Sequence, residues 1–157
     1  MYWPALLVIT LRVMPVVVSR SCELPPANKF FAHPGDRLVA TTTAAPPAAV
    51  AAVRAAGARV ETFGETDVDL DRLLGALRTR GVRFLLCEGG PTLAGELLAR
   101  GSVDELFLTH AILVTAEPDA RRLFEGSFRP AGTVRLRRVS LHEHDGEWYE
   151  RSLVRYE

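Results

Sequence analysis

Short apolar runs rich in β-branched residues alternate along the chain with longer segments of helical periodicity. The apolar runs predict buried strands, because their length is typical of strands and too short for most helices. They span residues 15–19, 38–42, 59–63, 82–87 and 105–114. The intervening segment 21–36 is rich in proline and glycine and therefore predicts a loop.

Three segments predict helices. Residues 46–56 are rich in alanine, begin with proline and end before a glycine, which is typical of helix termini. A second helix follows Asp67 or Asp69, either of which can cap it. Its apolar face consists of leucines at helical spacing: Leu70, Leu73, Leu74 and Leu77. The third helix spans residues 91–100.

The C-terminal part follows a different pattern. Residues 134–142 and 147–156 are strand-like runs joined by Asp145 and Gly146, and Asp-Gly is a strong hairpin signal. The strand–helix–strand runs before it imply a largely parallel sheet with helices on its faces. The predicted fold class is therefore α/β: a mixed, mostly parallel sheet flanked by helices, to which the C-terminal hairpin adds an antiparallel pair.

Composition narrows the function classes. A chain of 157 residues predicts a single domain over residues 1–157. Lys+Arg and Asp+Glu both number 19, and this zero net charge argues against a nucleic-acid binder driven by bulk charge. The apolar residues 1–18 are interrupted by Arg12 and Pro15, so they predict buried strands and neither a signal peptide nor a membrane span. With 2 cysteines, a reducing cytoplasmic setting is expected.

The segment with the clearest chemistry reads Leu-Cys-Glu-Gly-Gly-Pro-Thr-Leu over residues 86–93. An apolar run ends there in a carboxylate, two glycines follow, and a helix opens with proline. Ligands of open α/β sheets bind at the carboxyl ends of strands, and the free N–H groups of a helix N-terminus favour an anion. The spacing predicts either a phosphate cradle or a tight strand-to-helix turn and leaves both open. It matches neither the G-x-G-x-x-G fingerprint nor the P-loop.

The residues themselves resemble a known family. Residues 86–93, then Glu-Leu-Leu at 96–98, Val-Asp-Glu-Leu at 103–106 and Leu-Thr at 108–109, strongly resemble the reductase domain of riboflavin biosynthesis. That domain belongs to the dihydrofolate-reductase-like superfamily. The resemblance is specific over residues 84–109 and looser from the first strand to the C-terminus.

The resemblance implies NADPH-dependent reduction, as in 5-amino-6-(5-phosphoribosylamino)uracil reductase, by a homodimer that delivers a hydride to the opened ribosyl group. It places Glu88 at the nicotinamide and substrate end, as the catalytic residue. The residues implied to bind the cofactor are Ser19, Arg20, Thr41, Thr42, Gly89, Gly90, Thr92 and Leu93. In this set the two glycines hold the pyrophosphate, and Ser19 and Arg20 hold the adenosine 2′-phosphate, since an arginine fork matches a phosphate.

The earlier residues of this set also have plain structural interpretations. Arg20 is equally a surface arginine at the end of a strand. Thr41 and Thr42, which the resemblance places near the adenine, are good strand formers in any fold. Sequence alone leaves these alternatives open.

Two departures from the family pattern bear on catalysis. Residues 1–14 do not resemble the family's N-terminal part, in which a Ser-Leu-Asp-Gly-like segment serves the substrate and a Gly-x-Gly-Thr-like turn serves the cofactor. Residues 111–116 lack the proline and glycines that the family tends to carry there. One alternative function is therefore a truncated, non-catalytic nucleotide-binding or interaction module of the same fold. Another is a different nucleotide-binding α/β protein that shares the Gly-Gly turn.

The remaining candidates have weaker signals. His142 and His144 share one strand face, but a catalytic zinc site needs a third protein ligand and none is evident, so no metal is predicted. His110 is expected to be a hydrogen-bonded core residue, and Cys87 an inert buried thiol. The aromatic residues at 148–149 are expected in the core or in a dimer contact.

Overall fold

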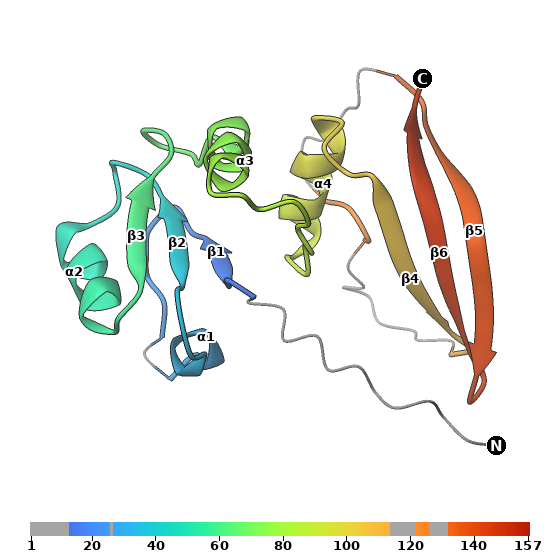
Figure 1. Ribbon diagram of the computed structural model, residues 1–157, viewed down its shortest axis with the longest axis horizontal. Coiled ribbons are helices and arrows are strands. Elements are labelled where there is room, and N and C mark those ends of the chain that lie inside the picture. The colour runs from blue at the N-terminus through green and yellow to red at the C-terminus, as the bar shows by residue number, and fades with distance from the viewer. Residues whose placement is uncertain (1–12, 26, 114–121, 126–131) are drawn as a thin grey trace. The chain divides into compact units, whose positions relative to one another are not determined.

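The computed structural model describes residues 13–25, 27–113, 122–125 and 132–157. The chain divides into two compact units, Met1–Arg83 and Phe84–Glu157, each with its own sheet (Figure 1). None of the described helices is long and apolar enough to cross a membrane.

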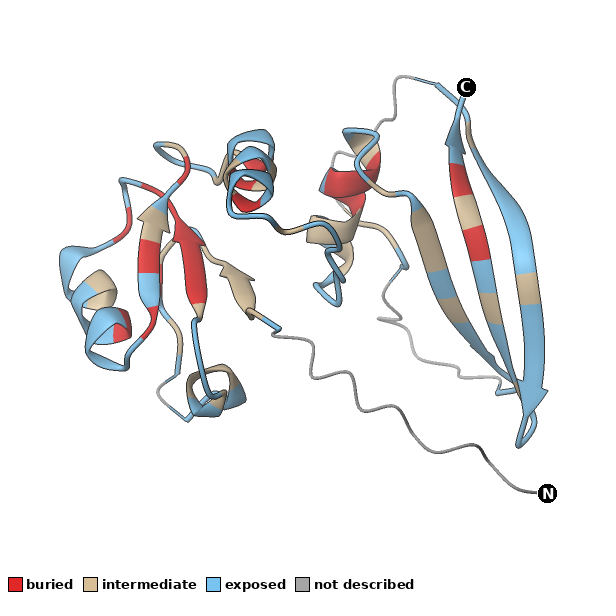
Figure 2. Ribbon diagram, in the orientation of Figure 1, coloured by how far each residue is buried: buried red, intermediate tan, exposed pale blue. Residues whose placement is uncertain are grey.

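A parallel three-stranded sheet forms the first unit. Its strands are β1 (Val16–Val18), β2 (Leu38–Thr41) and β3 (Arg59–Thr62), which pair in the order β1-β2-β3. The central strand, β2, is buried along its whole length (Figure 2). All three strands lie where the apolar runs predict them, so this part of the fold is confirmed.

Three helices accompany this sheet: α1 (Lys29–Ala32), α2 (Pro47–Ala55) and α3 (Leu70–Thr79). One hydrophobic cluster joins apolar side chains of all three strands to α1 and α2, and its members include Val17, Val39, Val60, Phe30 and Val53. Of the two predicted caps of α3, Asp69 is the one that acts, because its side chain accepts a hydrogen bond from the Arg72 backbone N–H at 3.0 Å.

The short helix α1 corrects the prediction of an uninterrupted loop over residues 21–36. The Asn28 side chain accepts a hydrogen bond from the backbone N–H of Phe30 at 2.9 Å and so caps the turn. Asparagine is a favoured N-cap residue, and this signal was present in the sequence. The many proline and glycine residues around Asn28 predicted a loop, and for this reason the short helix was not predicted.

The second unit combines one helix with an antiparallel sheet. After α4 (Pro91–Ala99) come β4 (Glu105–Ala111), β5 (Val134–His144) and β6 (Glu147–Tyr156), paired in the order β4-β6-β5. Asp145 and Gly146 join β5 to β6 with φ angles of 50° and 78°. These left-handed angles match the tight hairpin turn that the Asp-Gly pair predicts.

The predicted strand over residues 82–87 is wrong. Residues 82–90 lie in neither helix nor strand, and the side chains of Phe84 and Leu86 are 95% and 75% exposed. An apolar run becomes a strand only when a neighbouring edge accepts and donates its backbone hydrogen bonds. Within the described residues neither sheet includes this run, so β4 pairs with the hairpin in a sheet of its own. The α/β class is confirmed, whereas the single mixed sheet is corrected to two.

Candidate functional site

The loops that follow the three parallel strands meet at the carboxyl edge of their sheet. The backbone N–H groups of Thr43 and Ala44, after β2, donate to the carbonyl oxygens of Gly64 and Glu65, after β3, at 3.0 Å each. The loop after β1 joins them through side chains. Ligands of parallel sheets bind at this edge, so the convergence places Arg20 in a region suited to ligand binding.

Two buried threonines fix the backbone of the first of these loops. The hydroxyl groups of Thr41 and Thr42 both donate to the carbonyl oxygen of Arg20, at 3.1 and 3.0 Å. Both threonines are almost inaccessible to solvent, and the Ser19 backbone N–H donates to the Ala40 carbonyl oxygen at 3.0 Å. The structural role of the threonines is therefore to hold the turn at Arg20, and their contact with a cofactor stays a prediction.

The Arg20 guanidinium extends from this fixed turn to Asp67. The Arg20 Nη1 and Asp67 Oδ1 atoms lie 3.1 Å apart, and the two side chains are 74% and 76% exposed. A guanidinium carries five N–H donors, so this single contact leaves most of them for a second anion. Sequence analysis did not single out Asp67 as part of the site, because it comes from a loop distant in the chain.

The loop that carries Asp67 is tightly built. Gly64 has a φ of +125°, and a Cβ atom there would overlap the Asp67 carbonyl group. The Asp69 backbone N–H donates to the Phe63 carbonyl oxygen and closes the loop in front of α3. The backbone at Asp67 is therefore set by local geometry, although its side chain is open to solvent.

In the second unit, the first backbone N–H groups of α4 have no hydrogen-bond partner among the residues that the structure describes. Its N-cap residue, Gly90, has no side chain to cap the helix, and the first intrahelical bond runs from the Ala94 N–H to the Gly90 carbonyl oxygen at 3.1 Å. The N–H groups of Thr92 and Leu93 therefore precede the first intrahelical donor. The first turn holds no acidic residue, so these groups and the helix dipole favour an anion.

The two glycines before α4 differ in the space around them. A Cβ atom at Gly89 would come within 2.7 Å of Leu93 Cδ2, whereas one at Gly90 would meet nothing within 4 Å. Gly90 has a φ of −63°, which any residue can adopt. Neither the backbone angle nor a contact with a described residue therefore requires glycine at position 90, and the backbone there is open to a ligand within the described part of the chain.

Glu88 lies in the unpaired stretch before these glycines and is exposed. No hydrogen bond or ion pair within the described residues engages its carboxylate, which is therefore free to meet a ligand. The neighbouring Cys87 is exposed, so the prediction of a buried thiol is wrong. The cause is the missing strand: without pairing on a sheet, the apolar run stays open to solvent.

Comparison with known proteins assigns this architecture. The family model described as the RibD C-terminal domain matches residues 10–148. The chain belongs to the RibD C-terminal domain family. The match covers the carboxyl-edge residues of the first unit together with Glu88, the glycines and α4 of the second.

Curated relatives of this RibD C-terminal domain carry one name, 2,5-diamino-6-ribosylamino-4(3H)-pyrimidinone 5′-phosphate reductase. The proteins of Archaeoglobus fulgidus and Methanothermobacter thermautotrophicus are 33% and 34% identical over 111 residues, 71% of this chain in both cases. The chain spans about half the length of these relatives, 50% and 51%. A pyrimidine reductase-like protein of Corynebacterium diphtheriae shares the fold with a TM-score of 0.77 and 22% identity, over 92% of this chain and 62% of that one.

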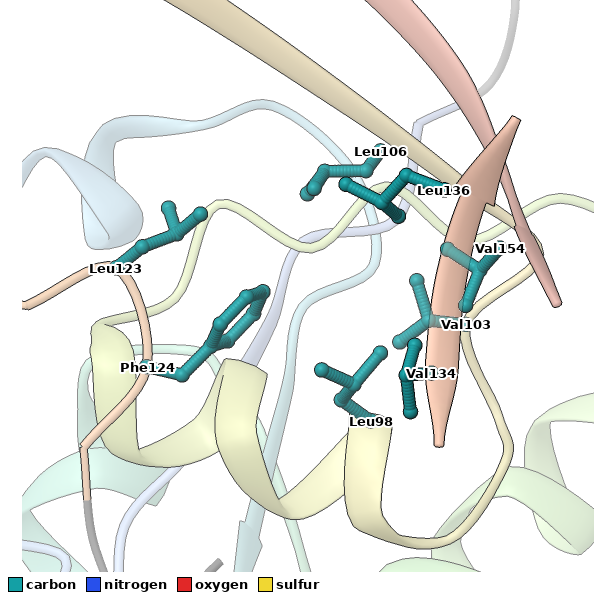
Figure 3. A pocket seen from close by; sticks show the side chains of 8 residues that line it. All are labelled: Leu98, Val103, Leu106, Leu123, Phe124, Val134, Leu136 and Val154. Carbon is teal, nitrogen blue, oxygen red and sulfur yellow. The ribbon is translucent and has the colours of Figure 1, made fainter. Parts of the chain in front are cut away.

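The RibD C-terminal domain also contains an apolar cavity of about 340 Å³ between α4 and the antiparallel sheet (Figure 3). Side chains from the helix and all three strands line it, among them Leu98, Leu106, Leu136 and Val154. Ligand sites combine apolar walls with a few placed polar groups. Because the labelled side chains of this cavity are all apolar, it is packing space and unsuited to a phosphorylated ligand.

The antiparallel sheet carries a cluster of polar side chains that the sequence did not predict. Ser152 Oγ donates to Glu150 Oε1 at 2.6 Å, and His110 Nε2 lies 3.2 Å from Glu150 Oε2. The Ser152 hydroxyl, and then His110 and Arg138, lower the pKa of Glu150 and outweigh the opposing effect of desolvation. The prediction of a hydrogen-bonded His110 is confirmed, but its side chain is 46% exposed and is not in the core.

Two further predictions concern the hairpin. Trp148 and Tyr149 are 45% and 40% exposed, so they are not core residues of this chain. Among the residues that the structure describes, no three His, Cys, Asp or Glu side chains are grouped to hold a metal ion. His142 and His144 therefore stand without a third ligand here.

Proposed function

We propose that this RibD C-terminal domain is an NADPH-dependent oxidoreductase of riboflavin biosynthesis that reduces a phosphorylated ribosylaminopyrimidine. Family membership and the names of the curated relatives support the reaction class. The structural observation that carries the proposal is the convergence of three loops on Arg20 at the carboxyl edge of the parallel sheet. That edge presents an exposed cation where dinucleotide-binding sheets meet their ligands.

Each unit offers one anion-binding element of a kind that a dinucleotide with a 2′-phosphate needs, and it is the family resemblance that assigns both elements to one cofactor. Such a cofactor has two groups that need anion-binding elements, the pyrophosphate and the 2′-phosphate. The N-terminus of α4 offers N–H groups that no described residue engages and, as far as the structure describes the chain, open space at Gly90, which suits the pyrophosphate. Arg20 offers a guanidinium, whose planar donors suit a terminal phosphate, with Ser19 beside it.

When bound, NADPH would supply a hydride for the ribosyl carbon. The protein's own part is binding and orientation. Thr41 and Thr42 hold the Arg20 turn, so that the backbone at Arg20 needs little ordering when the side chain meets a phosphate. The exposed Thr92 hydroxyl can add a donor at the α4 N-terminus, beside Leu93. Glu88, whose carboxylate is engaged by none of the described side chains, orients the substrate or the nicotinamide.

Two substrates of the same class differ by one ring substituent. The uracil substrate named by the family resemblance carries an oxygen where the 2,5-diamino substrate of the curated relatives carries an amino group. Either compound presents the same phosphorylated ribosyl group. The proposal therefore commits to the class, and a turnover assay with both compounds selects between them.

The decisive experiment measures NADPH oxidation by the purified chain with each pyrimidine, next to a binding titration with NADPH. Turnover with either substrate supports the proposal. Binding of NADPH without turnover of either substrate favours the non-catalytic nucleotide-binding module. A folded chain that binds neither NADPH nor NADH contradicts the proposal.

We also propose that the chain forms a homodimer, as the family resemblance implies. The exposed aromatic side chains of Trp148 and Tyr149 support this proposal, as does the outer edge of β5, which pairs with no further strand in the part of the chain that the structure describes. Sedimentation equilibrium at micromolar concentration tests it. A monomer at all concentrations would contradict it.

A further inference from the structure

A carboxylate stands beside the cation of the proposed 2′-phosphate site. Asp67 Oδ1 lies 3.1 Å from Arg20 Nη1, and both side chains are more than two-thirds exposed. Asp67 reaches this position from the loop after β3, whereas Arg20 comes from the loop after β1. Nothing in the fold requires the pair for stability, because exposed ion pairs contribute little to the free energy of unfolding.

We infer that Asp67 is a specificity-determining residue that weakens selection for a 2′-phosphate over a free 2′-hydroxyl at Arg20. The inference rests on the proposed function, since it concerns the adenosine end of the dinucleotide. Arg20 increases the preference for a 2′-phosphate, and Asp67 decreases it.

Two physical effects act in the same direction. A phosphate bound to the Arg20 guanidinium would carry about two negative charges next to the Asp67 carboxylate, and this repulsion opposes binding. A ribose 2′-hydroxyl carries no charge and can donate a hydrogen bond to a carboxylate, as acidic residues do at the ribose of NAD. Asp67 therefore disfavours the phosphorylated ribose and accepts the unphosphorylated one.

The geometry of the loops makes this effect specific to Asp67. Its backbone is set by the tight loop at Gly64, and the Arg20 backbone is set by the two threonine hydroxyls. The other nearby aspartate, Asp69, is engaged in capping α3 through the Arg72 N–H. Of these two aspartates, Asp67 is therefore the one whose carboxylate contacts the cation.

The test compares affinities of adenosine 2′,5′-bisphosphate and adenosine 5′-monophosphate, which differ only in the 2′-phosphate. Calorimetry on the full chain measures both ligands with the wild type and with Asp67→Asn. We expect Asp67→Asn to increase the preference for the bisphosphate by about fivefold at low salt and by less at high salt. Asp67→Glu, which keeps the charge, is expected to stay within about twofold of the wild type.

A matched control separates this local effect from a change in net charge. Asp36→Asn removes the same charge from an exposed position before β2, at the opposite edge of the sheet, and should leave the preference unchanged. An unchanged or decreased preference in Asp67→Asn overturns the inference, as does an equal effect of Asp36→Asn. A wild type that binds neither adenosine ligand overturns it too. NADPH turnover is measured separately, so a chain that selects the bisphosphate without reducing a pyrimidine contradicts the proposed function alone.

Discussion

The two candidate anion-binding elements of this chain are built in opposite ways. At the carboxyl edge of the parallel sheet, an exposed arginine is held by hydroxyl groups and faced by a carboxylate, and these groups come from three separate loops. At the start of α4, two backbone N–H groups and an open glycine come from one continuous turn. Under the proposed function, the first element recognises a particular phosphate, whereas the second holds any pyrophosphate.

This difference predicts which ligands each substitution should affect. Changes at the α4 turn should affect all dinucleotides alike, because the backbone donors there are proposed to contact the pyrophosphate, which all dinucleotides share. Changes at Arg20 should affect only ligands with a 2′-phosphate. The predictions below use this division.

The largest effect is expected from Gly90→Val. Its side chain would occupy the space at the α4 N-cap, where an added Cβ meets no described atom within 4 Å, and should exclude a pyrophosphate from the start of the helix. Loss of two hydrogen bonds to a charged group corresponds to about 3 kcal/mol, so NADPH and NADH should both bind about a hundredfold more weakly. Calorimetry measures both affinities.

The control for Gly90→Val is Gly75→Val in α3, where an added Cβ likewise meets nothing within 4 Å. Its binding should equal that of the wild type. Gly89→Val is less informative, because its Cβ would press on the Leu93 side chain. Unchanged dinucleotide binding by Gly90→Val would remove the α4 turn from the site.

The next effect is expected from Arg20→Ala. Loss of a charge-assisted contact to an exposed phosphate should weaken NADPH binding by about tenfold and change NADH binding by less than about twofold. The ratio of the two dissociation constants measures the effect. An equal loss for both dinucleotides would show that Arg20 does not distinguish the 2′-phosphate.

A smaller effect is expected from Thr42→Val. The substitution removes one of the two hydroxyl donors to the Arg20 carbonyl oxygen, which should lower the free energy of unfolding by about 1 kcal/mol. NADPH affinity should fall by about threefold because the turn is less ordered. Thr43→Val, at an exposed neighbouring position, serves as the control for both urea unfolding and binding.

The smallest effect concerns acid sensitivity of the antiparallel sheet. The Ser152 hydroxyl and His110 lower the pKa of Glu150 in the folded state, so the unfolded state binds the proton more readily. The stabilisation is therefore fully present above the ordinary glutamate pKa of about 4.3 and is lost as pH falls below it. Urea unfolding between about pH 5 and pH 3 should show a shallower pH dependence for Glu150→Gln than for the wild type. Equal slopes would contradict the assigned role of the cluster.

Much of the fold followed from local patterns in the sequence. The helices α2, α3 and α4 and the hairpin depend on residues that are neighbours in the chain, such as the Asp-Gly turn and the leucines of α3, and the apolar runs of β1, β2 and β3 found partner strands in one another. The structure of residues 82–87 could not be predicted from the local pattern, because an apolar segment becomes a strand only when it pairs with a strand elsewhere in the chain. Cys87 and the single mixed sheet were mispredicted for the same reason.

One part of the candidate site could likewise be predicted from local sequence, and the other part required the structure. The α4 turn could be identified from residues 86–93, since its donors and glycines are contiguous. The Arg20 position was identified through family resemblance, but its ion pair with Asp67 joins loops 47 residues apart. The threonines at 41 and 42 fitted a strand equally well, and their hydrogen bonds to the Arg20 carbonyl oxygen required the structure.

The central claim is that this chain binds a dinucleotide and selects its 2′-phosphate through Arg20. Calorimetric titration of the full chain with NADPH, and with NADH in parallel, tests it most directly. The account predicts binding of both, with NADPH the tighter ligand. A folded chain that binds NADH as tightly as NADPH, or binds neither, would contradict it.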